Sequence, residues 1–394
     1  MNFERLLASR TDAMGASAIR EILKVVSQPD MISLAGGIPA PESFPLEIIN
    51  ELVTNVIEKY SSAAFQYDQT EGFMPLRQTL AAYLQEKDIQ ASTDQVLIAS
   101  GSQGVLDAIG MVLISKGDRV AVEAPTYLGA LQAFNPYEPE YVCMETDENG
   151  LIPRSLDEVL QTGAIKFIYL VPTFQNPTGR TIPIERRQEI AAIIRKYNAL
   201  LVEDDPYSAL RFRGTDLAAI KTLAPEHVVY VSTLSKVFAP GLRIGFCVAP
   251  DLIRKWLVIV KQGVDLHTST FNQALAAEYL SGGYLKRHLP KIIDLYKPKQ
   301  EAMLGALEKY FPNEFRWSNP EGGMFLWAEG PKDLDMEKIY WKSVKKKVAF
   351  VPGKYFYTAK GEGIETMRLN FTMPDKTTID HAIKILADVI KTEL

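Results

Sequence analysis

A lysine set among small hydroxyl side chains is the feature of this sequence with the clearest capacity for covalent chemistry. Lys236 ends the run STLSK (residues 232–236), directly after an apolar segment that is typical of a buried strand. In a surface loop this lysine would be a solvated charge, whereas burial lowers the pKa of an amine enough for it to form a Schiff base. Arg243, seven residues later, could hold two phosphate oxygens with its planar guanidinium. We favour the Schiff-base lysine over the surface loop.

A cluster of acids follows another apolar segment, in the run VEDDPY (residues 202–207). A carboxylate such as Asp204, at the end of a strand, could hold a pyridine nitrogen in its protonated form, which makes the ring an electron sink for a carbanion. Capping of a following helix by Asp204 or Asp205 carries equal weight on these residues alone.

Two polar turns complete the set of candidate segments. The first, SGSQG (residues 100–104), opens a helix with small residues and free backbone N–H groups, which suits either a phosphate site or a plain strand-to-helix turn. The second runs from Val171 to Gly179 and contains Asn176, whose amide could donate to a cofactor or substrate oxygen, although turn formation alone would also explain it. All four segments follow strands, so one crevice can collect them.

The elements that must position these segments lie between about residue 46 and residue 260, where short apolar runs alternate with amphipathic stretches. The predicted strands are Gln95–Ala99, Arg119–Glu123, Tyr141–Met144, Phe167–Val171, Leu200–Glu203, Val228–Ser232 and Ile244–Ala249. Helices are predicted at Gly104–Ile114, Leu156–Gln161 and Ile184–Tyr197. This alternation predicts an α/β fold with a mostly parallel sheet wrapped by helices, which binds ligands at the carboxyl ends of its strands.

The two ends of the chain differ from this central part. The expected elements there are a short helix at Ser17–Val26, a long helix at Leu285–Tyr310, and a small sheet of Phe325–Ala328, Val348–Val351 and Met367–Phe371. We therefore predict a large domain at 46–283 and a smaller α+β domain at 284–394. Residues 1–45 are expected to pack on the small domain and the cleft.

Composition and charge exclude several classes of function. The 394 residues carry a formal net charge of −5, which offers no basic surface for nucleic acid and no polybasic strip for a membrane. No apolar run approaches the ~18 residues of a membrane helix, and the N-terminus lacks the pattern of a signal peptide. The two isolated cysteines, Cys143 and Cys247, predict a reducing, cytoplasmic location. The four histidines lack ligand spacing, so we expect no metal site.

Together the four segments resemble those of the fold type I pyridoxal phosphate (PLP)-dependent aminotransferases, class I/II. The resemblance rests on motifs in a specific order and spacing: NPTG at 176–179, DxxY at 204–207, and SK at 235–236 followed by Arg243. It extends from about residue 15 to residue 374. The runs IREILK (19–24) and ISLAGGIPAPE (32–42) resemble a narrower branch that contains 2-aminoadipate and kynurenine aminotransferases and the effector domains of a class of bacterial regulators. The implied fold is a mostly parallel seven-stranded sheet in a large domain with a smaller α+β domain.

The resemblance implies a role for each candidate residue around the cofactor, PLP. Lys236 would bind it as a Schiff base and later shuttle a proton between the substrate Cα and the cofactor C4′. Asp204 would pair with the pyridine nitrogen, while Asn176 and Tyr207 would hydrogen-bond the ring oxygen O3′. Tyr127 would stack on the ring. The implied phosphate-binding set is Gly101, Ser102, Gln103, Thr233, Ser235 and Arg243.

The resemblance also implies substrate-binding residues and a partner subunit. Arg368 would clamp the α-carboxylate, helped by Asn176 and the backbone near Gly37. Tyr67 would reach the phosphate of the partner subunit, so a homodimer with shared active sites is expected. A surface salt bridge is the usual alternative for an arginine. For Arg20, that alternative and contact with a distal acidic group of the substrate carry equal weight.

The expected reaction moves an amino group between an L-amino acid and a 2-oxo acid such as 2-oxoglutarate, by a ping-pong mechanism through Lys236. The donor could be 2-aminoadipate, an aromatic or kynurenine-like compound, or another amino acid. A PLP-dependent lyase or decarboxylase is an alternative, because the motifs identify the cofactor better than the reaction. A non-enzymatic PLP-binding regulatory module is less favoured, since the matching sequence begins by about residue 15 and leaves no room for a DNA-binding domain. A nucleotide-dependent dehydrogenase would leave Lys236 without a purpose.

Overall fold

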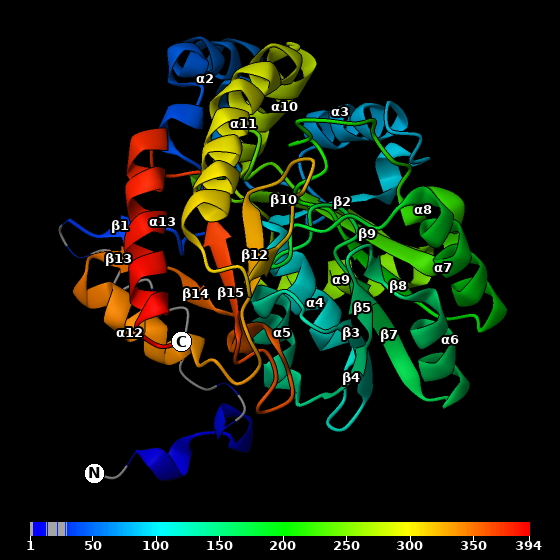
Figure 1. The fold of residues 1–394 in the computed structure, drawn as a ribbon. Helices are drawn as coiled ribbons and strands as arrows, with labels where there is room; N and C mark the ends of the chain where they lie inside the picture. Colours follow the sequence, from blue (N-terminus) through cyan, green and yellow to red (C-terminus); the bar gives the residue numbers. More distant parts are fainter. Residues whose placement is uncertain (1–2, 13, 15–21, 23–27, 29) are drawn as a thin grey trace.

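The computed structural model describes residues 3–12, 14, 22, 28 and 30–394, and its centre is a twisted sheet of seven strands (Figure 1). The strand order is β2 (Val96–Ser100), β10 (Ile244–Val248), β9 (Val228–Thr233), β8 (Leu201–Asp204), β7 (Ile165–Leu170), β3 (Arg119–Glu123) and β4 (Glu140–Met144). All neighbours are parallel except that β10 is antiparallel to both β2 and β9. The predicted α/β class and its mostly parallel seven-stranded sheet are confirmed, with strand bounds that agree within two residues.

Both faces of this sheet are covered, which explains why its strands read as continuous apolar runs. On one face Phe167 and Tyr169 of β7 pack with Phe134 of helix α5 (Leu128–Phe134). On the other face Ile168 and Leu170 pack in a second apolar cluster. The covering helices are α4 (Ser102–Leu113) and α5 on the first face, and α6 (Pro153–Gln161), α7 (Ile184–Lys196) and α8 (Ile220–Leu223) on the second.

The direction of β10 decides where Arg243 lies. Because β10 is antiparallel, it begins at the edge of the sheet where the parallel strands end. Its register places Ile244 opposite Ser100 and Gly245 opposite Thr233. Arg243, one residue before β10, therefore lies beside the polar segments that follow β2 and β9.

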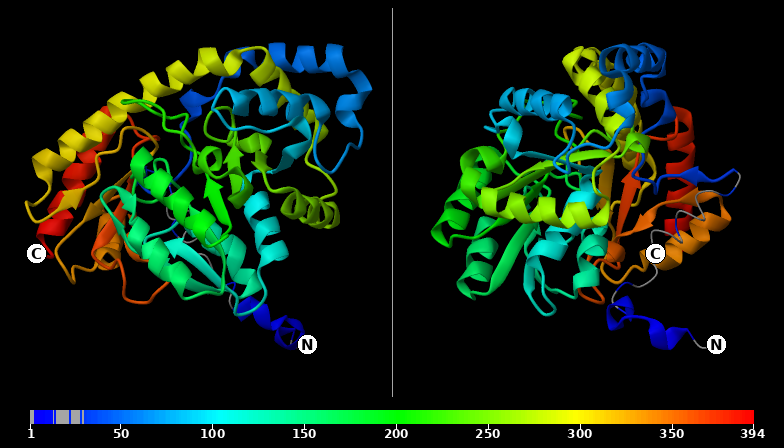
Figure 2. Two further views of the ribbon diagram at one scale, coloured as in Figure 1. Left: turned by 90° about the vertical axis from the view of Figure 1, so that its right-hand side faces the viewer. Right: turned by 180° about the vertical axis from the view of Figure 1, so that it is seen from behind.

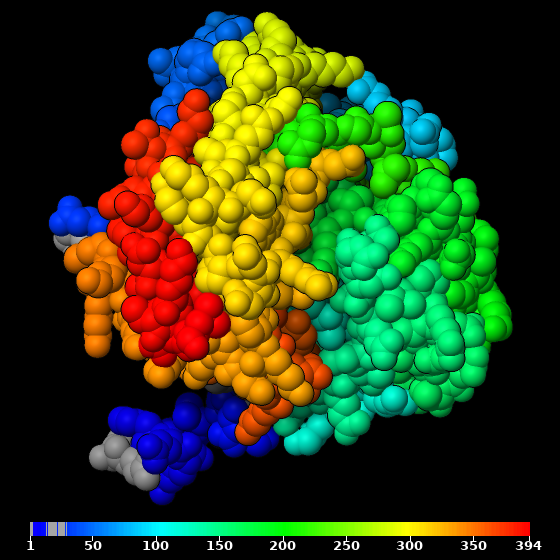
Figure 3. All heavy atoms as spheres, viewed as in Figure 1, coloured from blue at the N-terminus to red at the C-terminus, as the bar shows by residue number. Residues whose placement is uncertain are grey.

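A second, antiparallel sheet lies in the C-terminal part of the chain. Its order is β11 (Arg316–Trp317), β12 (Phe325–Glu329), β15 (Thr366–Asn370) and β14 (Val351–Pro352). Two long helices, α11 (Tyr284–Tyr310) and α13 (Lys376–Lys391), lie side by side next to it (Figure 3). Helix α12 (Met336–Lys345) completes this part. The long helix predicted at 285–310 is confirmed by α11.

The strand predicted at 348–351 is divided between two sheets. Val351 pairs with Arg368 in the small sheet, as predicted. The preceding pair, β13 (Val348–Ala349), instead forms a parallel ladder with β1 (Ile32–Ser33). The sequence pattern could not show this division, because every residue from 348 to 351 is buried and apolar.

Strand β1 brings the N-terminal segment toward the ends of the large-sheet strands. Leu34 donates to the Ala349 carbonyl at 2.7 Å and accepts from the Asn370 amide at 2.8 Å, so the chain continues between two elements of the C-terminal part. The helix predicted at 17–26 lies, apart from Ile22, outside the described residues. The domain limits 1–45, 46–283 and 284–394 stay a prediction.

The remaining elements surround these two sheets. In Figure 2, α11 runs from the small sheet toward α2 (Leu46–Tyr60) and α10 (Thr270–Ser281). Helix α10 also packs on α3 (Met74–Gln85), and α9 (Asp251–Val264) packs on α4. A short hairpin joins β5 (Thr146–Asp147) to β6 (Gly150–Leu151). Among the residues that the structure describes, no helix has both the length and the apolar character needed to cross a membrane.

Candidate active site

The polar segments that follow the strands meet in one cavity of about 390 Å³. Its walls come from the carboxyl ends of the parallel strands, the start of α4, the segment 35–38 and the small-sheet strands β14 and β15. The predicted site residues that line it are Gly37, Ser102, Gln103, Tyr127, Asn176, Asp204, Tyr207, Thr233, Ser235, Lys236, Arg243 and Arg368. The structure thus brings together residues that are more than 300 positions apart in the sequence.

The start of α4 and Arg243 form a corner that suits an anion. Gly101 is the N-cap of α4 with φ +83°, a conformation that favours glycine. A Cβ at Gly101 would lie 2.2 Å from Nη2 of Arg243. Arg243 donates to the Ser100 carbonyl at 3.2 Å and has no carboxylate partner in the described part of the chain. The N–H groups of the first helical turn and this guanidinium therefore face the same corner, which fits a phosphate.

Hydroxyl and amide side chains line the same corner. The hydroxyl oxygens of Thr233 and Ser235 are 2.9 Å apart, and Thr233 also donates to the Ile244 carbonyl. The Gln103 amide donates to the Gly129 carbonyl at 2.7 Å, which ties the start of α4 to the turn that carries Tyr127. These hydrogen bonds hold the side chains in place, so they can make further polar contacts to a bound phosphate.

Asp204 presents a buried carboxylate oxygen without a partner. It is the last residue of β8 and is 2% exposed. Its Oδ2 accepts from the Tyr169 hydroxyl at 2.7 Å, whereas Oδ1 has no hydrogen-bond partner in the part of the chain that the structure describes. Burial raises the pKa of Asp204 to about 7, and the hydrogen bond from Tyr169 opposes that shift. A cationic ring N–H at Oδ1 would satisfy this oxygen and favour the ionised carboxylate.

The three consecutive acids after β8 take three different positions. Because side chains alternate along a strand, Glu203 points to the face opposite Asp204, where its oxygens accept from the backbone of Ile220 and Lys221. Asp205 accepts from the Tyr230 hydroxyl at 2.7 Å. No helix follows β8 directly, so the capping alternative for the acids is wrong.

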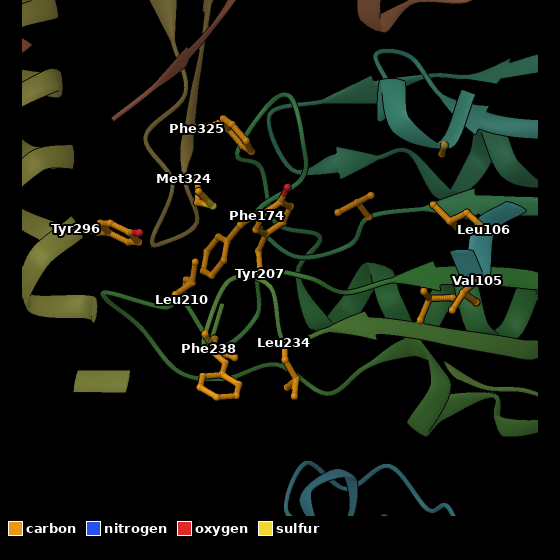
Figure 4. Packing of buried hydrophobic residues seen from close by; sticks show 14 of the residues in the cluster. Val105, Leu106, Phe174, Tyr207, Leu210, Leu234, Phe238, Tyr296, Met324 and Phe325 are labelled. Carbon is orange, nitrogen blue, oxygen red and sulfur yellow. The ribbon is translucent and has the colours of Figure 1, made fainter. Parts of the chain in front are cut away.

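Asn176 and Tyr207 meet across the floor of the cavity. The Asn176 amide nitrogen donates to the Tyr207 hydroxyl at 3.3 Å, and its oxygen accepts from Nη1 of Arg368 at 2.8 Å. Tyr207 packs edge-to-face on Phe325 of β12 and lies near Phe174 in a shared apolar cluster (Figure 4). The segment at 171–179 is therefore a turn that also presents an amide to the cavity.

Lys236 lies inside the cavity rather than on a surface loop. Its Nζ donates to the Gly37 carbonyl at 3.0 Å and has no carboxylate partner among the described residues. Burial, together with the positive charges of Arg368 and Arg243, lowers the pKa of Lys236 to about 8. An amine of this kind is deprotonated in a substantial fraction of molecules near neutral pH, as a nucleophile must be.

Arg368 is a buried cation in the centre of the small sheet, so the surface salt bridge is excluded. It is 3% exposed and donates to Asn176 and to the Ala35 carbonyl at 2.6 Å, while its Nε has no partner among the residues that the structure describes. The guanidinium lies 4.3 Å from the centre of the Phe325 ring and 5.0 Å from that of Phe356. Burial lowers the pKa of Arg368 to about 10. Its remaining donors suit a carboxylate in the cavity.

Among the predicted site residues that the structure describes, Gly101 and Tyr67 do not line this cavity, although Gly101 directly precedes the helix start that does. Tyr67 is 77% exposed and packs edge-to-face on His267 with ring centres 5.7 Å apart. Arg20 lies outside the described residues. Within the described ranges, no group of three or more His, Cys, Asp or Glu side chains is placed to hold a metal ion.

Sequence reasoning missed Tyr169, the residue that orients Asp204. It lies in the apolar strand predicted at Phe167–Val171, and no feature of the sequence assigns it a role in the site. The signal that could have found it is the alternation of β7 combined with its place next to β8, since Tyr169 pairs with Val202. Strand order was needed for that step, and the apolar runs alone do not give it.

The comparisons with known proteins agree with this geometry. A family model described as aminotransferase class I and II matches residues 29–386. The chain is 47% identical to aromatic-amino-acid aminotransferase 1 of Thermococcus litoralis, over 100% of this chain and 96% of that one. It is similar to the structure of Pyrococcus horikoshii kynurenine aminotransferase in complex with PMP, with a TM-score of 0.96, 45% identity, and coverage of 100% and 98%. It is also similar to an α-aminoadipate aminotransferase from Thermus thermophilus complexed with N-(5'-phosphopyridoxyl)-L-leucine, with a TM-score of 0.92, 37% identity, and coverage of 100% and 99%.

The fold and the cavity together define a PLP-dependent transferase. The chain belongs to the class I and II aminotransferases, and it is an aminotransferase with pyridoxal phosphate as its cofactor. The similarity to 2-aminoadipate and kynurenine aminotransferases agrees with the branch suggested by the N-terminal runs. The aminotransferase interpretation is confirmed over the lyase, the regulatory module and the dehydrogenase.

Proposed function

We propose that this enzyme transfers the amino group of an L-amino acid to 2-oxoglutarate by a ping-pong mechanism, with Lys236 as its covalent and proton-transferring residue. The observation that carries the proposal is the pairing of two unsatisfied cations in one cavity. The amine of Lys236 bonds only to a backbone carbonyl, and Arg368 has no carboxylate partner among the described residues. An amino acid substrate has the amino and carboxylate groups that would complement this pair.

The donor set fits PLP at each of its polar positions. Ser102, Gln103, Thr233, Ser235 and Arg243, with Gly101 at the turn, would hold the phosphate. Asp204 would keep the pyridine nitrogen protonated through its free Oδ1, while Asn176 and Tyr207 would donate to the ring oxygen. Tyr127 would stack on the ring. The bound cofactor supplies an electron sink that makes the substrate Cα–H acidic.

Lys236 would then act as general base and acid. Its amine, which lies in the cavity at the Gly37 carbonyl, would take the proton from the substrate Cα and deliver it to the cofactor C4′. Arg368, assisted by Asn176 and the backbone at Gly37, would fix the α-carboxylate so that the Cα–H faces this amine. Both half-reactions would use the same groups in the same cavity. The two substrates would therefore bind one after the other, which is a ping-pong sequence.

A panel of amino donors with 2-oxoglutarate tests the reaction and its specificity. We expect aromatic, kynurenine-like and 2-aminoadipate donors to be used, because relatives with these named substrates are similar over the whole chain. An amino acid alone should convert the bound cofactor to pyridoxamine phosphate without release of ammonia or carbon dioxide. Release of either would contradict the proposal.

Arg20→Ala should reduce the activity with acidic donors more than the activity with aromatic donors. Equal losses of activity with both kinds of donor would show that Arg20 does not contact the substrate.

We further propose a homodimer in which Tyr67 completes the partner's site. Because the Tyr67 side chain is 77% exposed in one chain, we expect a second chain to pack over it. Mixing Tyr67→Ala with Lys236→Ala chains should restore activity, because the hybrid has one site with both residues intact. Up to about half of the parental activity per dimer is expected. If Tyr67 acted within its own chain, or not at all on the site, no such recovery would appear.

The location that we propose is a reducing one, the cytoplasm. Cys143 is half-buried, Cys247 is buried, and both are free thiols. Burial also keeps the Cys247 thiol protonated, since it raises its pKa to about 12. Measuring the cellular fraction that contains the native enzyme tests this, and recovery from an oxidising compartment would contradict it.

A further inference from the structure

A buried carboxyl group, Glu123, lies beside the active-site loops and has no part in the roles proposed above. It is the last residue of β3 and is 2% exposed. Its Oε2 accepts from the backbone N–H of Val171 at 3.1 Å, at the point where β7 ends and the loop of Asn176 begins. In the described part of the chain, no lysine, arginine or histidine forms an ion pair with it.

Gln175 connects this carboxyl to two active-site loops. Its side-chain amide lies close enough to Glu123 to lower the pKa of that carboxyl. The same amide donates to the Pro125 carbonyl at 2.8 Å, two residues before Tyr127. Its oxygen accepts from the N–H and the hydroxyl of Thr178, at 2.8 and 2.6 Å, and so closes the turn around Asn176. Glu123 and Gln175 therefore join the loop that carries the stacking tyrosine to the loop that carries the cavity amide.

The surroundings of Glu123 favour its neutral form. Burial raises the pKa of Glu123 to about 8, and the hydrogen bond from Val171 and the nearby amide of Gln175 only partly oppose this. The other titratable group that interacts with it is Tyr169, whose hydroxyl donates to Asp204. A neutral carboxyl accepts and donates hydrogen bonds, so it can complete a network of amides without a buried charge.

We propose that Glu123 is a positioning residue of the aminotransferase reaction, which holds the loops of Asn176 and Tyr127 in register as an uncharged acid. It touches neither the substrate nor the reacting atoms. The inference rests on the proposed function, because it acts through the roles assigned to Asn176 and Tyr127. It predicts that shape and hydrogen bonding at residue 123 matter, and that charge does not.

The test compares Glu123→Gln, which keeps shape and hydrogen bonds, with Glu123→Ala, which removes them. The alanine variant is expected to bind PLP about 10- to 100-fold more weakly, since it leaves the buried Val171 N–H without its acceptor and removes the side chain beside Gln175. The pH titration of the visible absorbance of the lysine-bound cofactor should also shift. The glutamine variant should keep the parental affinity and titration. Equal behaviour of the two variants, whether both parental or both impaired, would overturn the inference.

Glu203→Gln is the matched control for general destabilisation. Glu203 is another buried acid on the same face of the sheet, with a pKa raised by burial to about 7. Its oxygens hold the backbone of α8 rather than an active-site loop. This variant should unfold at a lower temperature while the cofactor absorbance and its titration stay parental. A spectral shift as large as that of Glu123→Ala would show that any buried acid on this face has the same effect, and would contradict the positioning role.

A second measurement keeps the inference testable if Glu123→Ala does not fold. The pKa of Glu123 is higher in the folded than in the unfolded chain, so its contribution to stability is lost as pH rises toward about 8. Between pH 6 and 8 the unfolding temperature of the parent should fall more than that of Glu123→Gln. Parallel curves would contradict the neutral acid. Transamination by the parent is measured separately, so failure here leaves the proposed function standing.

Discussion

Lys236→Ala is expected to abolish transamination, with kcat reduced by at least about 10⁴-fold, because two contributions are lost together. The covalent bond that holds the cofactor ready for exchange disappears. The base that moves the proton from Cα to C4′ disappears with it. The measurement is single-turnover conversion of the bound cofactor with excess amino donor, alongside the absorbance spectrum of the loaded protein. A variant that retains both the spectrum and the turnover would contradict the role of Lys236.

Lys221→Ala is the matched control, because Lys221 is also a buried lysine whose pKa is lowered by burial to about 8. Its amine donates to the carbonyls of Pro225 and Val228, away from the active-site cavity. We expect this variant to keep the visible absorbance and to lose only stability. A lowered pKa alone therefore does not make a lysine the cofactor residue. Position at the end of β9, facing Arg368 and the anion corner, is what distinguishes Lys236.

The pH dependence of cofactor capture gives an independent check on Lys236. Capture requires the neutral amine, so the rate of PLP binding to the cofactor-free protein should rise as pH approaches about 8 and level off above it. The direction follows from burial and two neighbouring cations, all of which disfavour the ammonium form. A profile that still rises steeply toward pH 10 would show an ordinary, solvated lysine.

The large sheet could be predicted from the sequence because both of its faces are covered. Each strand, such as Arg119–Glu123, reads as a short apolar run bounded by polar or turn residues, and the intervening helices have a clear amphipathic period. The order and the direction of the strands could not be predicted from the sequence. No feature of the sequence of β10 marks it as antiparallel. Its direction nevertheless places Arg243 beside the start of α4, at the corner that suits an anion. The division at 348–351 was missed for a related reason, since both halves are equally apolar.

The sequence could predict the site residues whose type is unusual for their position. It could not predict the residues that only hold those residues in place. Lys236 and Asp204 stand out because charged side chains directly after apolar strands need a reason. Tyr169 and Glu123 do not stand out, because a tyrosine or a terminal acid in a strand is ordinary until its neighbours are known. Their contacts cross between strands, at 2.7 Å to Asp204 and 3.1 Å to Val171. Supporting residues of this kind follow from topology rather than from local pattern.

Arg368→Met is expected to lower kcat/KM for amino acid donors by about 10²- to 10⁴-fold, which corresponds to about 3–5 kcal/mol for a charge-assisted, bidentate contact in a buried site. The loss should appear mainly as a higher KM, because the carboxylate is held in both the ground state and the transition state. Arg368→Lys should not restore it, since an ammonium cannot provide the planar fork. A donor that is the same amine without its α-carboxylate is the control, and it should react equally with parent and variant.

Replacing Arg368 should affect the unfolding temperature differently from the activity. The guanidinium is buried between Phe325 and Phe356, its Nε lacks a partner among the described residues, and burial lowers its pKa to about 10, all signs of an uncompensated charge. Replacing such a charge with an apolar side chain of similar length is often neutral or stabilising. We therefore expect Arg368→Met to unfold at a temperature no lower than that of the parent. An unreactive carboxylate should raise the unfolding temperature of the parent but not of the variant, because only the parent binds it in the folded state. Equal stabilisation of both proteins would mean that the substrate carboxylate binds elsewhere, and that Arg368 only supports the sheet.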